Sequence, residues 1–138
     1  MKRTITFILA GIFALMVVFF VAIRIWIGHS IKENITIAKN HYSGNAEGAL
    51  IVFLSDTTNS PSDRSHIAIW TLGQMRSEKA LPYLNELYKN DPEGKTCRGR
   101  HDMVLCQYEI HKAMVSIDYG WLGANEKNWF GSWRRFNK

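Results

Sequence analysis

The strongest pattern in the chain is an unbroken apolar run near its N-terminus. Residues 5 to 23 contain no ionisable side chain, and a helix of that length covers the hydrocarbon core of a bilayer, which is about 30 Å thick. The run resumes after Arg24 with Ile25, Trp26 and Ile27, and arginine and tryptophan both suit the membrane interface. Residues 1–28 are therefore predicted to form a cytoplasmic N-terminus and a transmembrane helix.

A cleavable secretory signal is the alternative for this segment, because Met1, Lys2 and Arg3 make a basic start. A signal has an apolar region of about 7–15 residues and ends in small residues, whereas this run is longer and leads into Arg24 and Trp26. We therefore expect an uncleaved signal anchor. The basic start favours a cytoplasmic N-terminus, so the expected protein is single-pass in the cytoplasmic (inner) membrane, with an extracytoplasmic C-terminal domain.

Apolar residues at helical spacing follow the predicted span. Residues 29–44 are expected to form a juxtamembrane amphipathic helix, because Ser30 and Glu33 have the spacing of a capping box at a helix start. Ser43-Gly44-Asn45 then interrupts the pattern. A second helix is expected next, with an apolar stripe made of Ala46, Ala49, Leu50, Phe53 and Leu54.

Three further helices complete the pattern. Ser60 and Pro61 mark the start of the third, which is expected to run to about Met75. The fourth opens near Glu78 and tolerates Pro82 in or just after its first turn. Its stripe is Ala80, Leu84, Leu87 and Tyr88. The fifth is expected at about 101 to 118, with a stripe of Met103, Cys106, Ile110, Ala113, Met114 and Ile117. Hairpin-linked alternating runs do not occur, so the predicted fold class is all-α.

Two stretches of the chain are similar to each other. GALIVFLSDTTNSPSDR and KALPYLNELYKNDPEG share an Ala-Leu pair, a further apolar pair and an exit that contains aspartate. Other characteristic residues between and within them are Ala68, Trp70, Leu72-Gly73-Gln74 and Ala80-Leu81-Pro82. With these residues, the stretch from 46 to 88 resembles HEAT-like repeats of the type first named in phycobilisome lyases.

This resemblance implies a short α-solenoid over residues 45–120, in which antiparallel helix pairs stack into a right-handed protein-binding surface. Some family members are enzymes, but their chemistry does not reside in the repeat motif, and fold alone does not carry function across. Three features depart from the repeat pattern: Arg64 lies one position early, Met75-Arg76-Ser77 replaces the usual turn, and the loop 91–100 is long.

The distribution of charge argues against a nucleic-acid partner. The chain has 17 Lys and Arg against 12 Asp and Glu, a net charge of +5. Lys2, Arg3 and Arg24 supply +3 of it, which leaves +2 for the remainder. A nearly neutral exported domain lacks the basic footprint that displaces phosphate counterions. The expected partner is a protein, in a membrane complex whose oligomeric state the sequence leaves open.

Cys97 and Cys106 are the two cysteines of the chain. An oxidising compartment favours a disulfide between them, which would fold the long loop back onto the helices, and two inert thiols are the alternative. A metal site of Cys97, His101, Cys106 and His111 is disfavoured, because the last three are spaced five apart and would splay around a helix. No metal and no cofactor are therefore expected.

The C-terminal tail, residues 121–138, is rich in aromatic and basic residues. In a helix its aromatic side chains would gather on one side, where they either cap the last helix pair or bind a partner or lipid headgroups. The candidate partner-binding residues are Trp121, Trp129, Phe130, Trp133, Arg134, Arg135 and Phe136.

The titratable residues of the predicted fifth helix do not form an acid–base pair. They share no common face: Asp102, Glu109, His111 and Asp118. We therefore expect a non-enzymatic, membrane-anchored scaffold that binds a protein partner on the extracytoplasmic side. The alternative is an accessory or cofactor-handling, lyase-like enzyme, in which His66, Trp70 or His111 on a concave face contacts a small molecule.

Overall fold

The computed structural model describes residues 2–119, and all of their regular structure is helical, as the sequence pattern predicted. The chain divides into two units with a boundary between Glu33 and Asn34. We call residues up to Glu33 the N-terminal unit and residues from Asn34 the helical unit.

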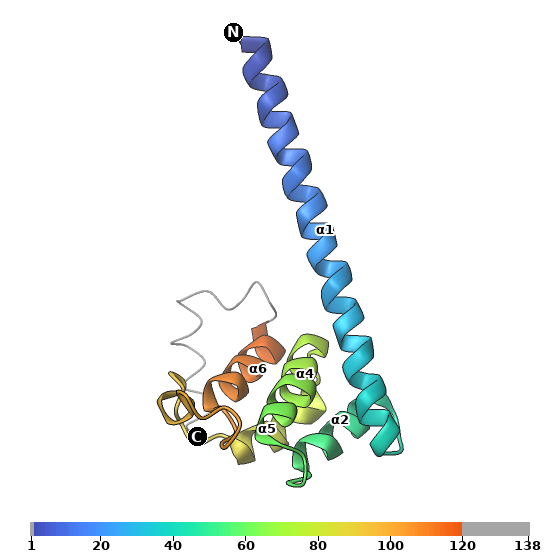
Figure 1. Ribbon diagram of the computed structural model, residues 1–138, viewed down its shortest axis with the longest axis vertical. Coiled ribbons are helices and arrows are strands. Elements are labelled where there is room, and N and C mark those ends of the chain that lie inside the picture. The colour runs from blue at the N-terminus through green and yellow to red at the C-terminus, as the bar shows by residue number, and fades with distance from the viewer. Residues whose placement is uncertain (1, 120–138) are drawn as a thin grey trace. The chain divides into compact units, whose positions relative to one another are not determined.

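Helix α1 spans Lys2–His41 (Figure 1). Its apolar stretch is long enough to cross a membrane, and none of the side chains in that stretch is buried within the chain. Length and composition fit both a membrane span and a signal sequence. The finding agrees with the predicted apolar helix.

The prediction that a separate helix starts at Ser30 is wrong, because α1 continues through Ser30 and Glu33 without interruption. Extending an existing helix adds one hydrogen bond per ordered residue, whereas a new helix has to nucleate at a cost in conformational entropy. The capping-box spacing therefore has no capping role here. The helix ends at His41, and Gly44 (φ 126°) turns the chain toward the next helix.

Helix α2 spans Ala46–Ser55 and confirms the predicted second helix. Asn45 caps its start, since the side-chain oxygen accepts a hydrogen bond from the Gly48 N–H at 2.7 Å. The predicted stripe is buried at Ala49, Leu50, Phe53 and Leu54. These residues form part of the core of the helical unit.

The predicted third helix is present with the predicted ends, in three consecutive parts. They are α3 (Pro61–Asp63), the π-helical segment η1 (Arg64–Ile69) and α4 (Trp70–Met75). Ser60 caps the start by accepting a hydrogen bond from the Asp63 N–H at 3.1 Å. The π-helical turns were not predicted, because the apolar pattern does not distinguish i→i+4 from i→i+5 hydrogen bonding.

Buried Arg64 has a structural role in this region. Its Nε donates a hydrogen bond of 2.6 Å to the Leu54 carbonyl near the end of α2, and burial lowers the pKa of the guanidinium from its usual value. The bond satisfies one of the carbonyls that a helix end leaves without a partner. Arg64 therefore ties η1 to α2.

The remaining helices are η2 (Glu78–Ala80), α5 (Leu81–Leu87), η3 (Lys95–Cys97) and α6 (Gln107–Tyr119). The predicted fourth helix is confirmed, with Pro82 in the first turn of α5. The predicted fifth helix starts too early, because residues 101–106 form turns and Met103 is 75% exposed. The rest of its stripe, from Cys106 to Ile117, is buried.

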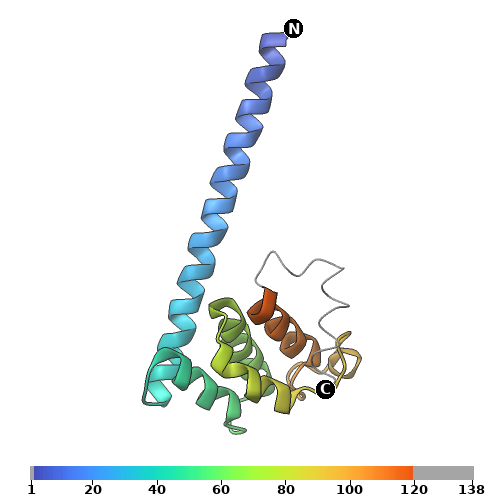
Figure 2. The same cartoon turned by 180° about the vertical axis from the view of Figure 1, so that it is seen from behind.

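The core of the helical unit lies where α4 packs along α6 and α2 packs against η1. Figures 1 and 2 show α4 and α6 side by side from opposite directions. Gly73 permits this approach, since a Cβ there would lie 3.0 Å from Ala113 Cα. Ala38, in the last turns of α1, is fully buried in the same core. The main buried residues are Leu50, Leu54, Ile69, Leu72, Leu84, Ile110 and Met114.

Candidate functional site

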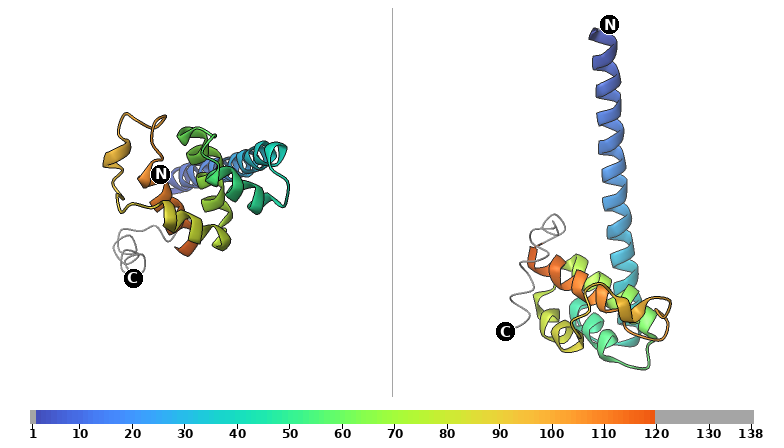
Figure 3. Two further views of the ribbon diagram at one scale, coloured as in Figure 1. Left: turned by 90° about the horizontal axis from the view of Figure 1, so that it is seen from below. Right: turned by 90° about the vertical axis from the view of Figure 1, so that its left-hand side faces the viewer.

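The segment between α5 and α6 carries both cysteines, and we call residues 90–106 the cysteine loop. It lies beside α6, on the opposite side of the helical unit from α2 (Figure 3). The loop opens with two left-handed residues, Asn90 (φ 56°) and Gly94 (φ 62°). Asparagine and glycine tolerate this conformation better than other residues, so the local sequence favours the reversal.

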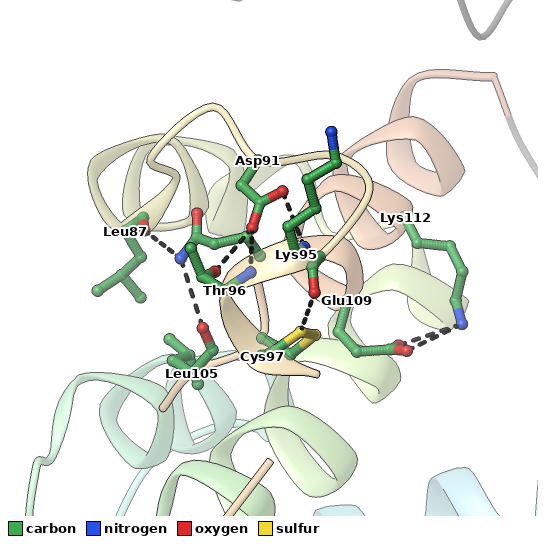
Figure 4. The surroundings of a disulfide bond; sticks show 11 residues. Leu87, Asp91, Lys95, Thr96, Cys97, Leu105, Glu109 and Lys112 are labelled. Carbon is green, nitrogen blue, oxygen red and sulfur yellow. Dashed lines mark hydrogen bonds and ion pairs between the residues drawn. A yellow bond between two sulfur atoms is a disulfide. The ribbon is translucent and has the colours of Figure 1, made fainter. Parts of the chain in front are cut away.

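Asp91 holds the first half of the cysteine loop. Its carboxylate accepts hydrogen bonds from the Lys95 N–H at 3.0 Å, the Thr96 N–H at 2.8 Å and the Thr96 hydroxyl at 2.7 Å. These bonds, those from Thr96 foremost, hold the pKa of Asp91 below its usual value. They place η3, and with it Cys97, against the rest of the loop (Figure 4).

Gln107 holds the other end of the cysteine loop. Its Oε1 accepts a hydrogen bond from the Lys89 N–H at 2.5 Å, and its Nε2 donates to the Leu87 carbonyl at 3.2 Å. The side chain is buried, so these bonds replace water at the end of α5. The first residue of α6 is thereby fixed to the last turn of α5, and the ends of the loop are held together.

The two cysteines meet inside the loop, as the disulfide hypothesis predicted. Their sulfur atoms lie 2.06 Å apart, at disulfide distance, and their Cα atoms 5.1 Å apart. Both residues are only 2% exposed. Gly94 lies against the pair, because a Cβ at this position would be 3.0 Å from Cys97 Sγ and 3.6 Å from Cys106 Sγ.

His101 lies close to the two cysteines, contrary to the expectation that His101 and Cys106 point in different directions from a helix. Residues 101–106 are not helical, so the five-residue spacing does not set the direction of either side chain. One possible ligand atom each from Cys97, His101 and Cys106 lies within 4.8 Å of the others. His101 itself is exposed. Three of the four residues of the disfavoured metal site are therefore brought together.

The fourth residue, His111, lies in the core instead. Its ring stacks on Tyr88, with centroids 5.7 Å apart and planes 28° from parallel, and the residue is 1% exposed. Burial lowers the pKa of His111. Burial, followed by the nearby Asp91 charge, raises the pKa of Tyr88 to about 12. Both rings are therefore neutral at pH 7, and they join α6 to the end of α5.

The residues of the alternative, accessory-enzyme hypothesis have different environments. His66 is exposed on η1, Trp70 is partly buried at the start of α4, and His111 is buried. Because His111 is buried, a ligand reaches its ring only if the surrounding core residues move. The hypothesis that His66, Trp70 or His111 contacts a small molecule stays a prediction.

Two other carboxylates with lowered pKa hold the helices together. Asp56 accepts hydrogen bonds from the Tyr42 hydroxyl at 2.6 Å and from the Thr58 N–H and hydroxyl, and these lower its pKa to about 2. Glu47 accepts a hydrogen bond from the Ser77 hydroxyl and pairs with Lys79 at 3.1 Å. The Ser77 bond is the main cause of the lowered Glu47 pKa.

All seven candidate partner-binding residues of the tail, from Trp121 to Phe136, lie outside the described residues. Sequence reasoning also missed the residues that shape the cysteine loop: Asp91, Gly94 and Gln107. A signal for the first two was available, because aspartate followed shortly by glycine in residues 90–94 is typical of a hydrogen-bonded turn. The role of Gln107 depends on contacts with α5 and has no local signal.

Comparison of the chain with known protein families, with curated proteins and with solved structures found no match.

Proposed function

We propose that the chain is a non-enzymatic, membrane-anchored interaction module that binds a protein partner on the extracytoplasmic side. The observation that carries the proposal is the pairing, in one short chain, of a helix able to cross a membrane with cysteines at disulfide distance. Disulfides persist in oxidising compartments. An uncleaved anchor with a cytoplasmic N-terminus would deliver the cysteine loop to such a compartment.

We further propose that the helical unit is a short HEAT-like stack. α2 followed by η1 and α4 would be one helix pair, and α5 followed by α6 the next. The packing of α2 against η1 and of α5 against α6 supports the two pairs, and the packing of α4 along α6 supports their stacking. Repeats of this kind bury their faces only against neighbours. The burial of Ala38 shows that the last turns of α1 contribute to the same core.

The environment of the acidic groups favours binding over catalysis. Asp56 is engaged by Tyr42 and Thr58, Glu47 by Ser77 and Lys79, and Asp91 by the backbone of its own loop. Carboxylates with lowered pKa values are charged at neutral pH and serve poorly as general acids. Their hydrogen bonds fix turns and helix ends, so these groups support a rigid platform.

Crosslinking in native membranes tests the proposal, with the full-length chain carrying a photocrosslinker at position 125, which lies in the tail but outside the residues deleted below. We expect a specific crosslinked protein that co-purifies with the chain. Deletion of residues 128–138 should abolish the crosslink, because aromatic residues and arginine dominate interface hot spots. The double variant Trp129→Ala/Trp133→Ala should have the same effect, whereas Lys127→Ala/Asn128→Ala is the matched control and should retain it.

Two results would contradict this assignment. Unfolding of the helical unit on deletion of residues 128–138, measured by circular dichroism, would mean that the tail aromatics belong to the core. Equal crosslinking by the tryptophan variant and its control would mean that the tail does not recognise the partner. A partner that still co-purifies with the tryptophan variant would place the binding surface on the helix faces.

A further inference from the structure

We propose that the cysteine loop in its reduced state binds a zinc-class metal ion through Cys97, His101 and Cys106. A metal ion and a disulfide would then be alternative cross-links of the same loop. The proposal concerns a second chemical state of this loop and does not depend on which protein the chain binds.

The distances between the three side chains suit such a site. Their candidate ligand atoms lie within 4.8 Å of one another, and tetrahedral zinc holds sulfur and nitrogen ligands about 3.3–3.8 Å apart. The sulfur atoms separate to reach this spacing once the bond between them is open. His101 needs only a change of rotamer, because it is exposed and lies outside a helix.

The loop is held by bonds that do not involve the disulfide. Asp91 accepts three hydrogen bonds from Lys95 and Thr96, and buried Gln107 joins α6 to the end of α5. Reduction therefore leaves Cys97 and Cys106 near each other. Gly94 lies directly against both sulfur atoms, since a Cβ there would meet Cys97 Sγ at 3.0 Å and Cys106 Sγ at 3.6 Å.

The donor set determines the class of ion. Two thiolates and an imidazole are soft to borderline ligands that select zinc over magnesium and calcium, which prefer oxygen. Three protein ligands leave the fourth tetrahedral position to water. The cysteines are 2% exposed, whereas His101 is exposed, so the ion would enter from the His101 side.

The two states interconvert by a balanced exchange. A dithiol transfers two electrons and two protons to the disulfide, which yields two thiols, and the dithiol becomes a disulfide itself. The divalent ion then displaces one proton from each thiol as it binds. A newly translocated chain already carries thiols and needs no reductant. Metal binding would protect these thiols until they are oxidised.

Cobalt titration of the full-length protein in detergent micelles tests the proposal. The protein is reduced with dithiothreitol, desalted without oxygen and titrated with Co²⁺, whose thiolate charge-transfer and tetrahedral absorption bands report the ligands. We expect one Co²⁺ per chain, displaced by Zn²⁺ and unaffected by Mg²⁺. His101→Ala should weaken binding at least about tenfold, and His66→Ala, at another exposed histidine, should not. The oxidised protein and Cys97→Ser/Cys106→Ser should show no tetrahedral spectrum.

A second measurement keeps the proposal testable if the serine variant fails to fold. Zn²⁺ should slow alkylation of both thiols in the wild-type protein, and slow it less in His101→Ala, as intact mass shows. The proposal is overturned if reduced protein gives no tetrahedral cobalt spectrum. It is also overturned if His101→Ala binds as tightly as wild type, or if oxidised protein binds equally well.

Discussion

At the scale of the residue, Gly73 has the sharpest steric constraint in the packing of α4 on α6. A Cβ there would lie 3.0 Å from Ala113 Cα and 3.1 Å from Ala113 Cβ, closer than ordinary van der Waals contact. The Ser116 hydroxyl also donates a hydrogen bond of 3.0 Å to the Gly73 carbonyl. Any side chain introduced at position 73 would therefore push α4 and α6 apart.

We predict that Gly73→Val destabilises the helical unit, since overpacking typically costs about 1–3 kcal/mol. Thermal unfolding in detergent should show a midpoint lower by several degrees. Gly73→Ala should lower the midpoint less than Gly73→Val does. Adding Ala113→Gly to the Gly73→Val variant should partly restore its stability. Gly28→Ala is the control, because a Cβ at that helical glycine meets nothing within 4 Å. An unchanged midpoint for Gly73→Val would refute this account of the packing.

At the scale of the element, His111 on α6 stacks on Tyr88 at the end of α5. Because burial lowers the His111 pKa from 6.5 in the folded state, the unfolded chain binds a proton more readily. The contribution of His111 to stability is therefore complete above about pH 6.5 and declines as the pH falls below that value. Acidification should loosen the contact between α5 and α6.

We predict that denaturant unfolding of the wild-type protein shows a free energy of unfolding that falls between pH 7 and pH 5. His111→Gln should be less stable at pH 7, through lost stacking, but should show a shallower dependence on pH. His66→Gln, at an exposed position, should keep the wild-type slope. A slope that is equally steep in His111→Gln would show that other groups cause the acid sensitivity.

At the scale of the whole molecule, the open question is the fate of the apolar helix. One helix among the described residues is long and apolar enough to cross a membrane. We predict that the mature protein retains residues 1–28, as intact mass will show. Protease added to spheroplasts should digest the helical unit without lysis. Protection until lysis would reverse the proposed topology and remove the main argument for an oxidising environment around Cys97 and Cys106.

The helical elements were largely predictable because their signals are local. The stripe of α2, the Ser60–Pro61 start and the tolerance of Pro82 in α5 follow from helical periodicity and from capping chemistry within a few residues. The long apolar run predicted the character of α1 in the same way. Each of these features depends on residues that are neighbours along the chain.

Two local patterns led to wrong helix boundaries for the same reason: the capping-box pattern at Ser30 and the apolar stripe that includes Met103. The capping-box pattern does not reveal that the preceding helix continues through Ser30. The apolar stripe does not reveal that its first residues lie in a loop before α6. The sequence by itself determined the helical class, the apolar helix and most of the buried faces, such as that of α2, because periodicity is local. Only the tertiary structure decided where α6 begins and that His101 lies beside the cysteines while His111 is buried against Tyr88, because those outcomes depend on contacts between distant residues.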